Sequence, residues 1–198
     1  MPKDFSSYTD GQLVKGILKK DWFFLRELFK RYTKPFFNLS YRFSGDRQTA
    51  EDLTSEILWR IYKNLNKFDI KKPFKPWAFK VATNVCLTYS KTKQRSVTFS
   101  SILWWRKKNE GLEEVGEFEV EDKKTNLMEE IEKNEISRRV QKALKKLPEK
   151  YRLCLYLYYF EDLKYEEIAD NLEIPINTVR THIKRGKEGL KKYLGDLL

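Results

Sequence analysis

An acidic stretch in the middle of the chain limits how the rest of it can fold. Between residues 109 and 135 there are eleven aspartates and glutamates against three lysines, a net charge of −8. A segment with this much like charge and few large apolar residues cannot bury enough surface to form its own core. We therefore expect a first domain over residues 1–98, an acidic linker over residues 99–135 and a second domain over residues 136–198.

Apolar residues recur at helical spacing on both sides of this linker, so the fold class is predicted to be all-α, with two small helical domains. Residues 1 to 12 have no clear pattern and are expected to be a loose lead. Pro35 should break or kink the second helix, because proline lacks the backbone N–H. In the first domain, we expect one helix to begin at Leu13, a second to begin at Asp21, and two more to span residues 49–65 and 77–89. In the second domain, we expect one helix that ends at Leu147, one that begins at Pro148, and a pair of helices within residues 165–190.

Residues 165–190 have the pattern of two short helices joined by a sharp turn at Pro175. Asn177 and Thr178 are candidate N-caps for the second helix. Val179, Ile183 and Leu190 then give that helix a buried stripe. This is the arrangement of a DNA-binding helix-turn-helix.

The opposite face of this last helix is basic. Between residues 180 and 194 there are six lysines and arginines against one acid, Glu188. A charged helix face is often only a solvated surface, but an excess of cations this large favours binding to DNA. The outward positions, suited to base edges and phosphates, are Arg180, Thr181, Lys184, Arg185 and Lys187.

A second basic region lies in the first domain. Residues 60–95 contain ten cations and one acid, Asp69, interleaved with aromatic residues. Cations that follow a backbone and rings that stack on bases are what a single-stranded nucleic-acid platform needs. The alternative is that the aromatic residues are core, and for Trp77 and Phe79 the two interpretations are evenly balanced.

The predicted helix over residues 49–65 carries a cluster of polar residues near its start: Glu51, Asp52, Ser55 and Glu56. Acids in the first turns of a helix are favoured by the helix dipole, which is sufficient to explain the cluster. The other interpretation is a docking surface for a basic partner. The residues alone favour the first.

The formal net charge of +11 favours a polyanionic partner, and nucleic acid is the first choice. Cys86 and Cys154 lie far apart in apolar runs, so they are expected to be reduced packing residues. With one histidine and no CxxC pair, we expect no metal, and the chain has no GxxxxGK[ST] phosphate loop, so we expect no cofactor. No signal peptide or long apolar run is present, which favours a cytoplasmic protein.

Two longer segments resemble one known family. Residues 147–194, LPEKYRL through KKYL, look like region four of the extracytoplasmic-function (ECF) type of bacterial RNA polymerase sigma factor, in the sigma-70 family. Residues 50–68, AEDLTSEILWRIYKNLNKF, and residues 76–89, PWAFKVATNVCLTY, look like region two. The resemblance covers roughly residues 20–195.

The resemblance implies a transcription initiation factor, not an enzyme, that works with core RNA polymerase and promoter DNA. The implied polymerase contacts are the clamp helices of the largest subunit and the flap of the second-largest subunit, and an anti-sigma factor is a possible further partner. The residues matching polymerase-binding positions are Asp52, Leu53 and Glu56. Those matching contacts to the unpaired −10 element are Phe68, Lys71, Lys72, Lys75, Trp77, Lys80 and Asn84. Those matching contacts to the −35 element are Arg180, Thr181, His182, Lys184 and Arg185.

Two other functions compete with this one. A two-domain helix-turn-helix regulator would bind duplex operators without polymerase. A nuclease or transposase would need clustered carboxylates for a metal ion, and only Glu51, Asp52 and Glu56 come close to that arrangement outside the linker.

Overall fold

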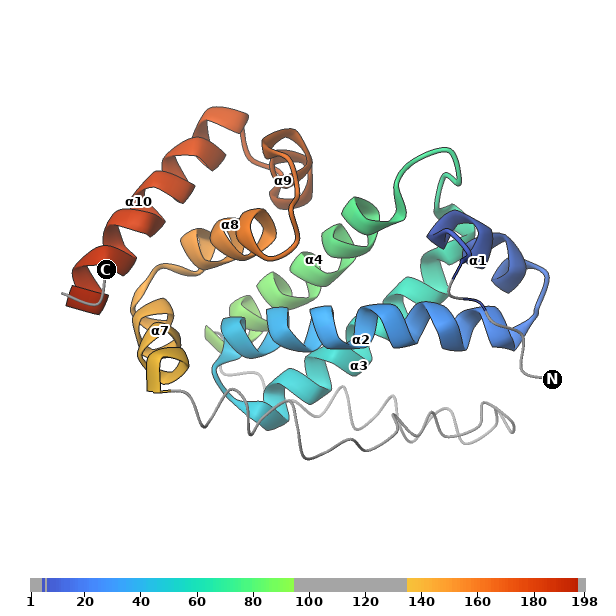
Figure 1. The fold of residues 1–198 in the computed structure, drawn as a ribbon, viewed down its shortest axis with the longest axis horizontal. Coiled ribbons are helices and arrows are strands. Elements are labelled where there is room, and N and C mark those ends of the chain that lie inside the picture. Colours follow the sequence, from blue (N-terminus) through green and yellow to red (C-terminus); the bar gives the residue numbers. More distant parts are fainter. Residues whose placement is uncertain (1–4, 6, 95–134, 196–198) are drawn as a thin grey trace.

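A computed structural model describes residue 5, residues 7–94 and residues 135–195, and these are helical with short connections. Helices α1 to α4 form a first module, and helices α7 to α10 form a second (Figure 1). The expected acidic linker lies outside the described residues, except for its last position, Glu135. Within the described ranges, every helix is too short or too polar to span a lipid bilayer.

Helix α1 (Asp10–Leu18) begins earlier than the sequence pattern predicted, because Thr9 caps it. The Gln12 N–H donates to the Thr9 hydroxyl over 3.3 Å, and the Thr9 N–H donates to Gln12 Oε1 over 2.8 Å. This reciprocal capping box satisfies two backbone donors that would otherwise have no partner. The expectation of a loose lead is wrong for the described residues before α1, because Phe5 is buried against Phe24 and the Phe5 and Tyr8 carbonyls accept hydrogen bonds from Arg31.

Helix α2 (Trp22–Ser44) begins where predicted, since the Asp21 carboxylate accepts a hydrogen bond from the Phe23 N–H over 3.1 Å. Pro35 was predicted to break or kink this helix, and it does not break it, because α2 continues through it. An interior proline costs about 3 kcal/mol. The buried side chains on both sides of it each contribute about 1.5–3 kcal/mol, which is enough to keep the helix intact. They are Leu25, Leu28, Tyr32, Phe36, Leu39 and Phe43.

The rest of the first module follows the predicted order with shifted ends. Helix α3 spans Arg47–Asn64, capped by Asp46, and a short 3₁₀ helix, η1, spans Leu65–Lys67. Helix α4 spans Phe74–Gln94, so it begins before the predicted start at residue 77, and Pro76 lies in its first turn, where proline is tolerated.

The second module comprises α7 (Glu135–Lys146), α8 (Glu149–Tyr159), α9 (Tyr165–Leu172) and α10 (Ile176–Leu194). Helix α8 is the central helix of this module, with Leu153 through Leu157 buried.

Two helix starts in this module differ from the prediction, because prolines occupy the caps. The Pro175 carbonyl accepts the Thr178 and Val179 N–H groups, so Asn177 and Thr178 are inside α10 and are not its N-cap. Pro148 likewise lies one residue before α8, with its carbonyl accepting from the N–H groups of residues 151 and 152.

The two modules pack directly against each other. Helix α9 packs on α4, and α8 and α7 pack on α2, so one continuous apolar cluster includes residues from both modules. Figure 1 shows the second module lying along α4 and α2. Both Cys86 and Cys154 are buried free thiols, as expected of packing residues.

Two glycines in α1 provide a matched test of how closely α1 packs on α2. A methyl group on Gly16 would overlap the ring of Phe24, whereas one on Gly11 would lie 3.8 Å from the nearest atom, the Ile70 carbonyl oxygen. We expect Gly16→Ala to destabilise the chain by about 1–3 kcal/mol through overpacking.

Gly11→Ala should instead stabilise it by about 0.5–1 kcal/mol, because alanine favours the helix. Thermal and urea unfolding of both variants checks this pair. Similar stability changes of the same sign would contradict the packing described for Gly16.

Candidate nucleic-acid interface

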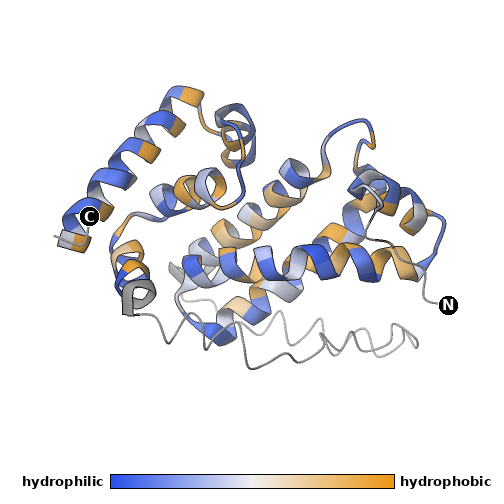
Figure 2. Cartoon of the chain, viewed as in Figure 1, coloured by the Kyte–Doolittle hydropathy of each residue, from blue (hydrophilic) through white to orange (hydrophobic). Residues whose placement is uncertain are grey.

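Helices α9 and α10 form the predicted helix-turn-helix. Val179 and Ile183 are buried, as expected. Gly186 is buried as well, and a methyl group there would come within 2.9 Å of the Leu155 side chain on α8, so α10 lies very close to α8. In Figure 2, α10 is hydrophilic along most of its length, with apolar residues at intervals.

The predicted outward residues of α10 are exposed, namely Arg180, Thr181, Lys184, Arg185 and Lys187. They form a row of cations and one hydroxyl on the side away from the core. Because these groups donate hydrogen bonds and carry positive charge, the row suits phosphates and base edges of duplex DNA.

Tyrosines of α8 and a nearby amide hold some of these side chains. The Tyr151 hydroxyl accepts a hydrogen bond from Arg185 and raises the pKa of that guanidinium. Tyr159 similarly raises the pKa of Lys187, whose ammonium lies 5.7 Å from the ring centre. Arg180 Nη1 lies 3.4 Å from Asn177 Oδ1. The charged face is thus partly oriented before any ligand binds.

His182 lies differently from the other predicted groove residues. Its ring is half-buried against α8, 4.9 Å from the Tyr151 ring, and its Nδ1 lies 3.8 Å from Cys154 Sγ. Burial lowers the pKa of His182, and the charges of Lys150 and Arg185 lower it further. The imidazole is therefore a packing group in the free chain, with only part of its surface facing outward.

In the first module, the aromatic residues of the basic region lie mostly in the core. Phe68 and Phe74 are buried, and Phe79 is fully buried. The Phe68 and Trp77 ring centres lie 5.2 Å apart, with Trp77 partly buried. The core interpretation is therefore correct for Phe79, and Phe68 can stack on a base only if this cluster rearranges.

The polar residues of that region divide into two groups. Lys71, Lys72 and Asn84 are exposed. Lys75 and Lys80, in contrast, form ion pairs with the second module, to Glu161 over 3.2 Å and to Glu173 over 3.5 Å.

The three predicted polymerase-binding residues on α3 also differ from one another. Leu53 is 2 % exposed and belongs to the core, so its side chain is not available to a partner in this conformation. Glu56 accepts a hydrogen bond from Arg60 over 2.5 Å. Asp52 is half-buried and lies 3.4 Å from the Gln48 amide.

An exposed aromatic cluster lies beside α3, and the sequence pattern gave no sign of it. Trp22 and Phe23 are 49 % and 64 % exposed. The Trp22 ring lies 6.0 Å from that of Tyr62, and Tyr62 lies 6.0 Å from Trp59. These residues start one helix and sit on another, so no local pattern connects them.

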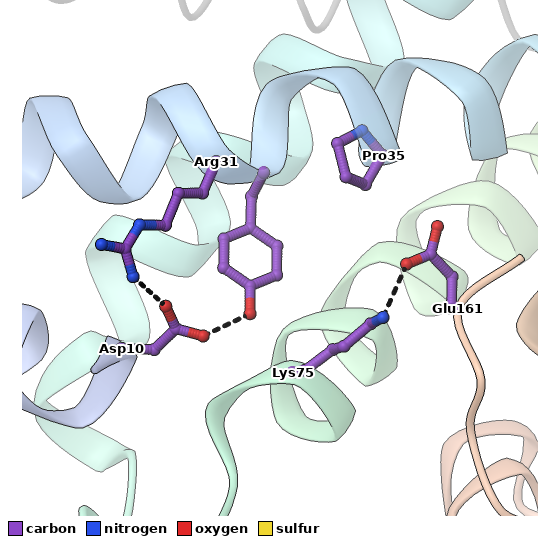
Figure 3. Close-up of a pocket in the computed structure, with 6 residues that line it drawn as sticks. Asp10, Arg31, Pro35, Lys75 and Glu161 are labelled. Carbon is purple, nitrogen blue, oxygen red and sulfur yellow. Dashed lines mark hydrogen bonds and ion pairs between the residues drawn. The ribbon is translucent and has the colours of Figure 1, made fainter. Parts of the chain in front are cut away.

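The sequence pattern also gave no sign of Glu161, a central polar group between the modules. Glu161 is 6 % exposed and pairs with Lys75, which lies 86 positions earlier in the chain. A single acid after an apolar run does not indicate such a distant partner. Around this pair lies a small cavity of about 220 Å³ between Asp10, Arg31, Tyr32, Pro35, Lys75 and Glu161 (Figure 3).

No group of three or more histidine, cysteine or carboxylate side chains is placed to hold a metal ion within the described parts of the chain. The candidate site instead consists of exposed hydrogen-bond donors and cations on both modules.

Comparisons with known proteins agree with this description. The family model Sigma-70 region 2 matches residues 28–96, and the model Sigma-70, region 4 matches residues 137–190. The chain is 31 % identical over 189 residues to the ECF RNA polymerase sigma factor SigW of Bacillus subtilis, covering 93 % of this chain and 96 % of that protein. It is 28 % identical to the ECF RNA polymerase sigma-E factor of Escherichia coli K12, covering 96 % of each.

The fold is similar to two solved structures. One is CnrH in complex with the cytosolic domain of CnrY, with a TM-score of 0.64 and 17 % identity, covering 93 % of this chain and 96 % of that one. The other is the sigma factor RpoE in complex with the anti-sigma factor NepR from Bartonella quintana, with a TM-score of 0.56 and 17 % identity, covering 92 % and 99 %.

The packing of His182, the only histidine of the chain, predicts a pH dependence. Its pKa in the folded chain is lowered below 6.5, so the unfolded chain binds more protons there. The stability that this ring contributes is therefore complete above about pH 6.5 and is lost as the pH falls through the lowered pKa.

We expect the melting temperature to fall between about pH 7.5 and about pH 5.5, and His182→Gln to reduce that fall, because glutamine does not titrate. The single imidazole signal in NMR gives the pKa directly. A midpoint at or above that of a histidine peptide would show that His182 is not packed in this way.

Proposed function

The chain belongs to the ECF class of the sigma-70 family of RNA polymerase sigma factors, and on that premise we propose how its residues divide promoter recognition. A sigma factor binds core RNA polymerase and directs it to specific promoters, where it initiates transcription. The observation that supports the assignment most is the exposed basic face of α10, on a helix-turn-helix within the region 4 match.

In this proposal the second module, residues 136–198, reads the −35 element as duplex DNA. Helix α10 enters the major groove, with Arg180 and Arg185 donating to base edges and Lys184 to phosphate. Thr181 supplies a short hydroxyl beside them. His182 supports the helix from behind and contributes at most an edge of its ring to the groove.

The first module, residues 1–98, holds the unpaired −10 strand. Lys71, Lys72, Lys75 and Lys80 follow the phosphates, and Asn84 contacts a flipped base. Phe68 and Trp77 shape the pocket from the aromatic cluster beneath it.

Capture of an unpaired base can open the duplex without ATP hydrolysis. Each stacked base contributes about 1–3 kcal/mol, which is comparable with the few kcal/mol that unpairing costs. We propose no catalytic chemistry and no cofactor for this chain. As a partner of core polymerase it would work in the cytoplasm, and an anti-sigma protein is a further proposed partner.

Core polymerase docks, in this proposal, on the outer side of α3 through Asp52 and Glu56. Leu53 keeps the helix in place from the core and is not itself a contact. The carboxylates favour a basic surface on the clamp helices of the largest subunit, while the second module meets the flap of the second-largest subunit.

Purified chain and core polymerase test the proposal as a whole. We expect the chain to co-purify with core enzyme and to support transcription from a promoter selected out of a randomised library. A gel shift of the chain alone on the same duplex should be weak. Strong duplex binding without polymerase, together with no association with core enzyme, would favour a helix-turn-helix regulator instead.

Replacing both Arg180 and Arg185 with alanine should remove −35-dependent transcription and leave polymerase binding nearly intact. Each specific arginine contact contributes about 1–3 kcal/mol, so the double change should cost at least about tenfold in promoter activity. Lys191→Ala with Lys192→Ala is the matched control, since it removes two cations from the far end of the same helix. Equal losses in both pairs would indicate a charge effect only.

Asp52→Lys should weaken association with core polymerase, because it reverses a charge at the proposed contact. Glu51→Lys is the control: it makes the same charge change one position earlier, on the side of α3 where Glu51 pairs with Arg47 over 2.7 Å. Binding can be followed by biolayer interferometry with immobilised core enzyme. Unchanged binding of the Asp52 variant would contradict the docking role and leave the interaction with the helix dipole as the explanation of the acidic cluster.

A further inference from the structure

Two lysines proposed to hold the −10 strand are already occupied by carboxylates of the second module. Lys75 Nζ lies 3.2 Å from Glu161 Oε2, and the Glu161 side chain is 7 % exposed. Lys80 Nζ lies 3.5 Å from Glu173 Oε1, at the end of α9. Figure 3 shows Lys75 reaching from α4 towards Glu161, close to Pro35 of α2.

Glu161 is held firmly in this position. The Tyr156 hydroxyl lies 2.8 Å from Glu161 Oε1 and also 2.8 Å from the Pro35 carbonyl of the first module. The Arg42 guanidinium of α2 lies 4.2 Å from the Phe160 ring centre and 5.5 Å from that of Tyr156. The end of α8 is therefore anchored on α2, and the carboxylate is directed at Lys75.

Further contacts join the modules away from Glu161. The Ser90 hydroxyl lies 2.7 Å from the Glu149 carboxylate, and Lys145 donates to the Gly45 carbonyl over 2.9 Å. Cys86 is fully buried, and burial and then the charge of Glu149 raise the pKa of its thiol, while the thiol in turn raises the pKa of Tyr156. Cys86 therefore lies close to where the modules meet. Together these contacts define a closed arrangement of the free chain.

This arrangement cannot read a promoter. The −35 and −10 elements are named for positions about 25 base pairs apart, which is about 85 Å along duplex DNA. Modules joined by ion pairs cannot span that distance. They must separate first, and separation also frees Lys75 and Lys80.

We propose that in the free chain Glu161 and Glu173 occupy the ammonium groups of Lys75 and Lys80 in place of DNA phosphates, so that the second module masks the strand-binding surface of the first. The proposal rests on the proposed function of α4. A carboxylate already paired with each ammonium neutralises its charge and repels a phosphate, and the second module that carries it covers the same surface. Binding of single-stranded DNA and closure therefore compete, and the separation imposed on polymerase removes the mask.

The test compares two double variants without polymerase. Glu161→Gln with Glu173→Gln removes the two masking charges. Glu166→Gln with Asp170→Asn removes two exposed acids of α9, which changes the net charge by the same amount. Affinity is measured by fluorescence anisotropy with labelled oligothymidine.

We expect the masking variant to bind the oligonucleotide about fivefold more tightly than the original chain, as the loss of two partly exposed ion pairs implies. The control should change affinity by less than about twofold. An equal gain in both variants, or no gain in the masking variant, overturns the proposal. Glu173→Gln alone should give a smaller gain in the same direction, which keeps the test valid if the buried Glu161 change unfolds the chain.

Cys86 supplies an independent measure of opening. Burial raises the pKa of its thiol to about 12, so it reacts with a disulfide reagent only after an opening that exposes it. Because the charge of Glu149 reaches this thiol, separation of the modules is the opening that we expect to expose it. In a Cys154→Ser background, we expect the masking variant to be labelled several times faster than its parent and the α9 control at the parent's rate. Faster labelling without tighter DNA binding overturns the masking role of the carboxylates.

Failure of the proposed function would look different. It would show as no association of the unaltered chain with core polymerase, whatever the labelling rates. When core polymerase does bind, the rate of Cys86 labelling in the complex should rise above that of the free chain.

Discussion

Helix α4 is covered on two sides, and the arrangement of both modules depends on this. One side packs on α2 and α3, and the other packs on α9 of the second module. Its residues Ala78, Phe79, Ala82 and Cys86 are each fully buried. Burying apolar side chains from both modules against one helix is the main favourable term, and the ion pairs at its edge mostly decide orientation.

The same helix carries the residues that the proposed function needs. Aromatic side chains and lysines alternate near its start, and they separate by physical character. Phe74 and Phe79 enter the core, because removing a large ring from water contributes more than an exposed stacking surface in the absence of DNA. The lysines remain outside with their charged ends in reach of acids or phosphates. The proposed strand-binding surface and the docking surface for the second module are thus the same surface.

The two modules also differ in how ready they are to bind. The cations of α10 are exposed, and Tyr151 and Tyr159 orient two of them before any ligand is present. Lys75 and Lys80 are paired with acids, and Phe68 is packed away. The proposed −35 surface is therefore preorganised, while the proposed −10 surface would require the modules to separate.

The fold class of this chain and the exposed face of its last helix follow from its sequence alone. Helical periodicity predicted the all-α fold, and the spacing of Val179 and Ile183 predicted which face of α10 is exposed. These are local properties, set by residues a few positions apart. The family resemblance identified a sigma factor because it uses the order of such local segments.

Only the tertiary structure decided what the long-range partners are. The continuity of α2 through Pro35 depends on apolar contacts along its whole length, which outweigh one missing hydrogen bond. Glu161 and Lys75 are paired although 86 positions separate them. No periodic pattern carries that information, because a salt bridge between modules depends on how two packed surfaces meet and not on the neighbours of either residue along the chain.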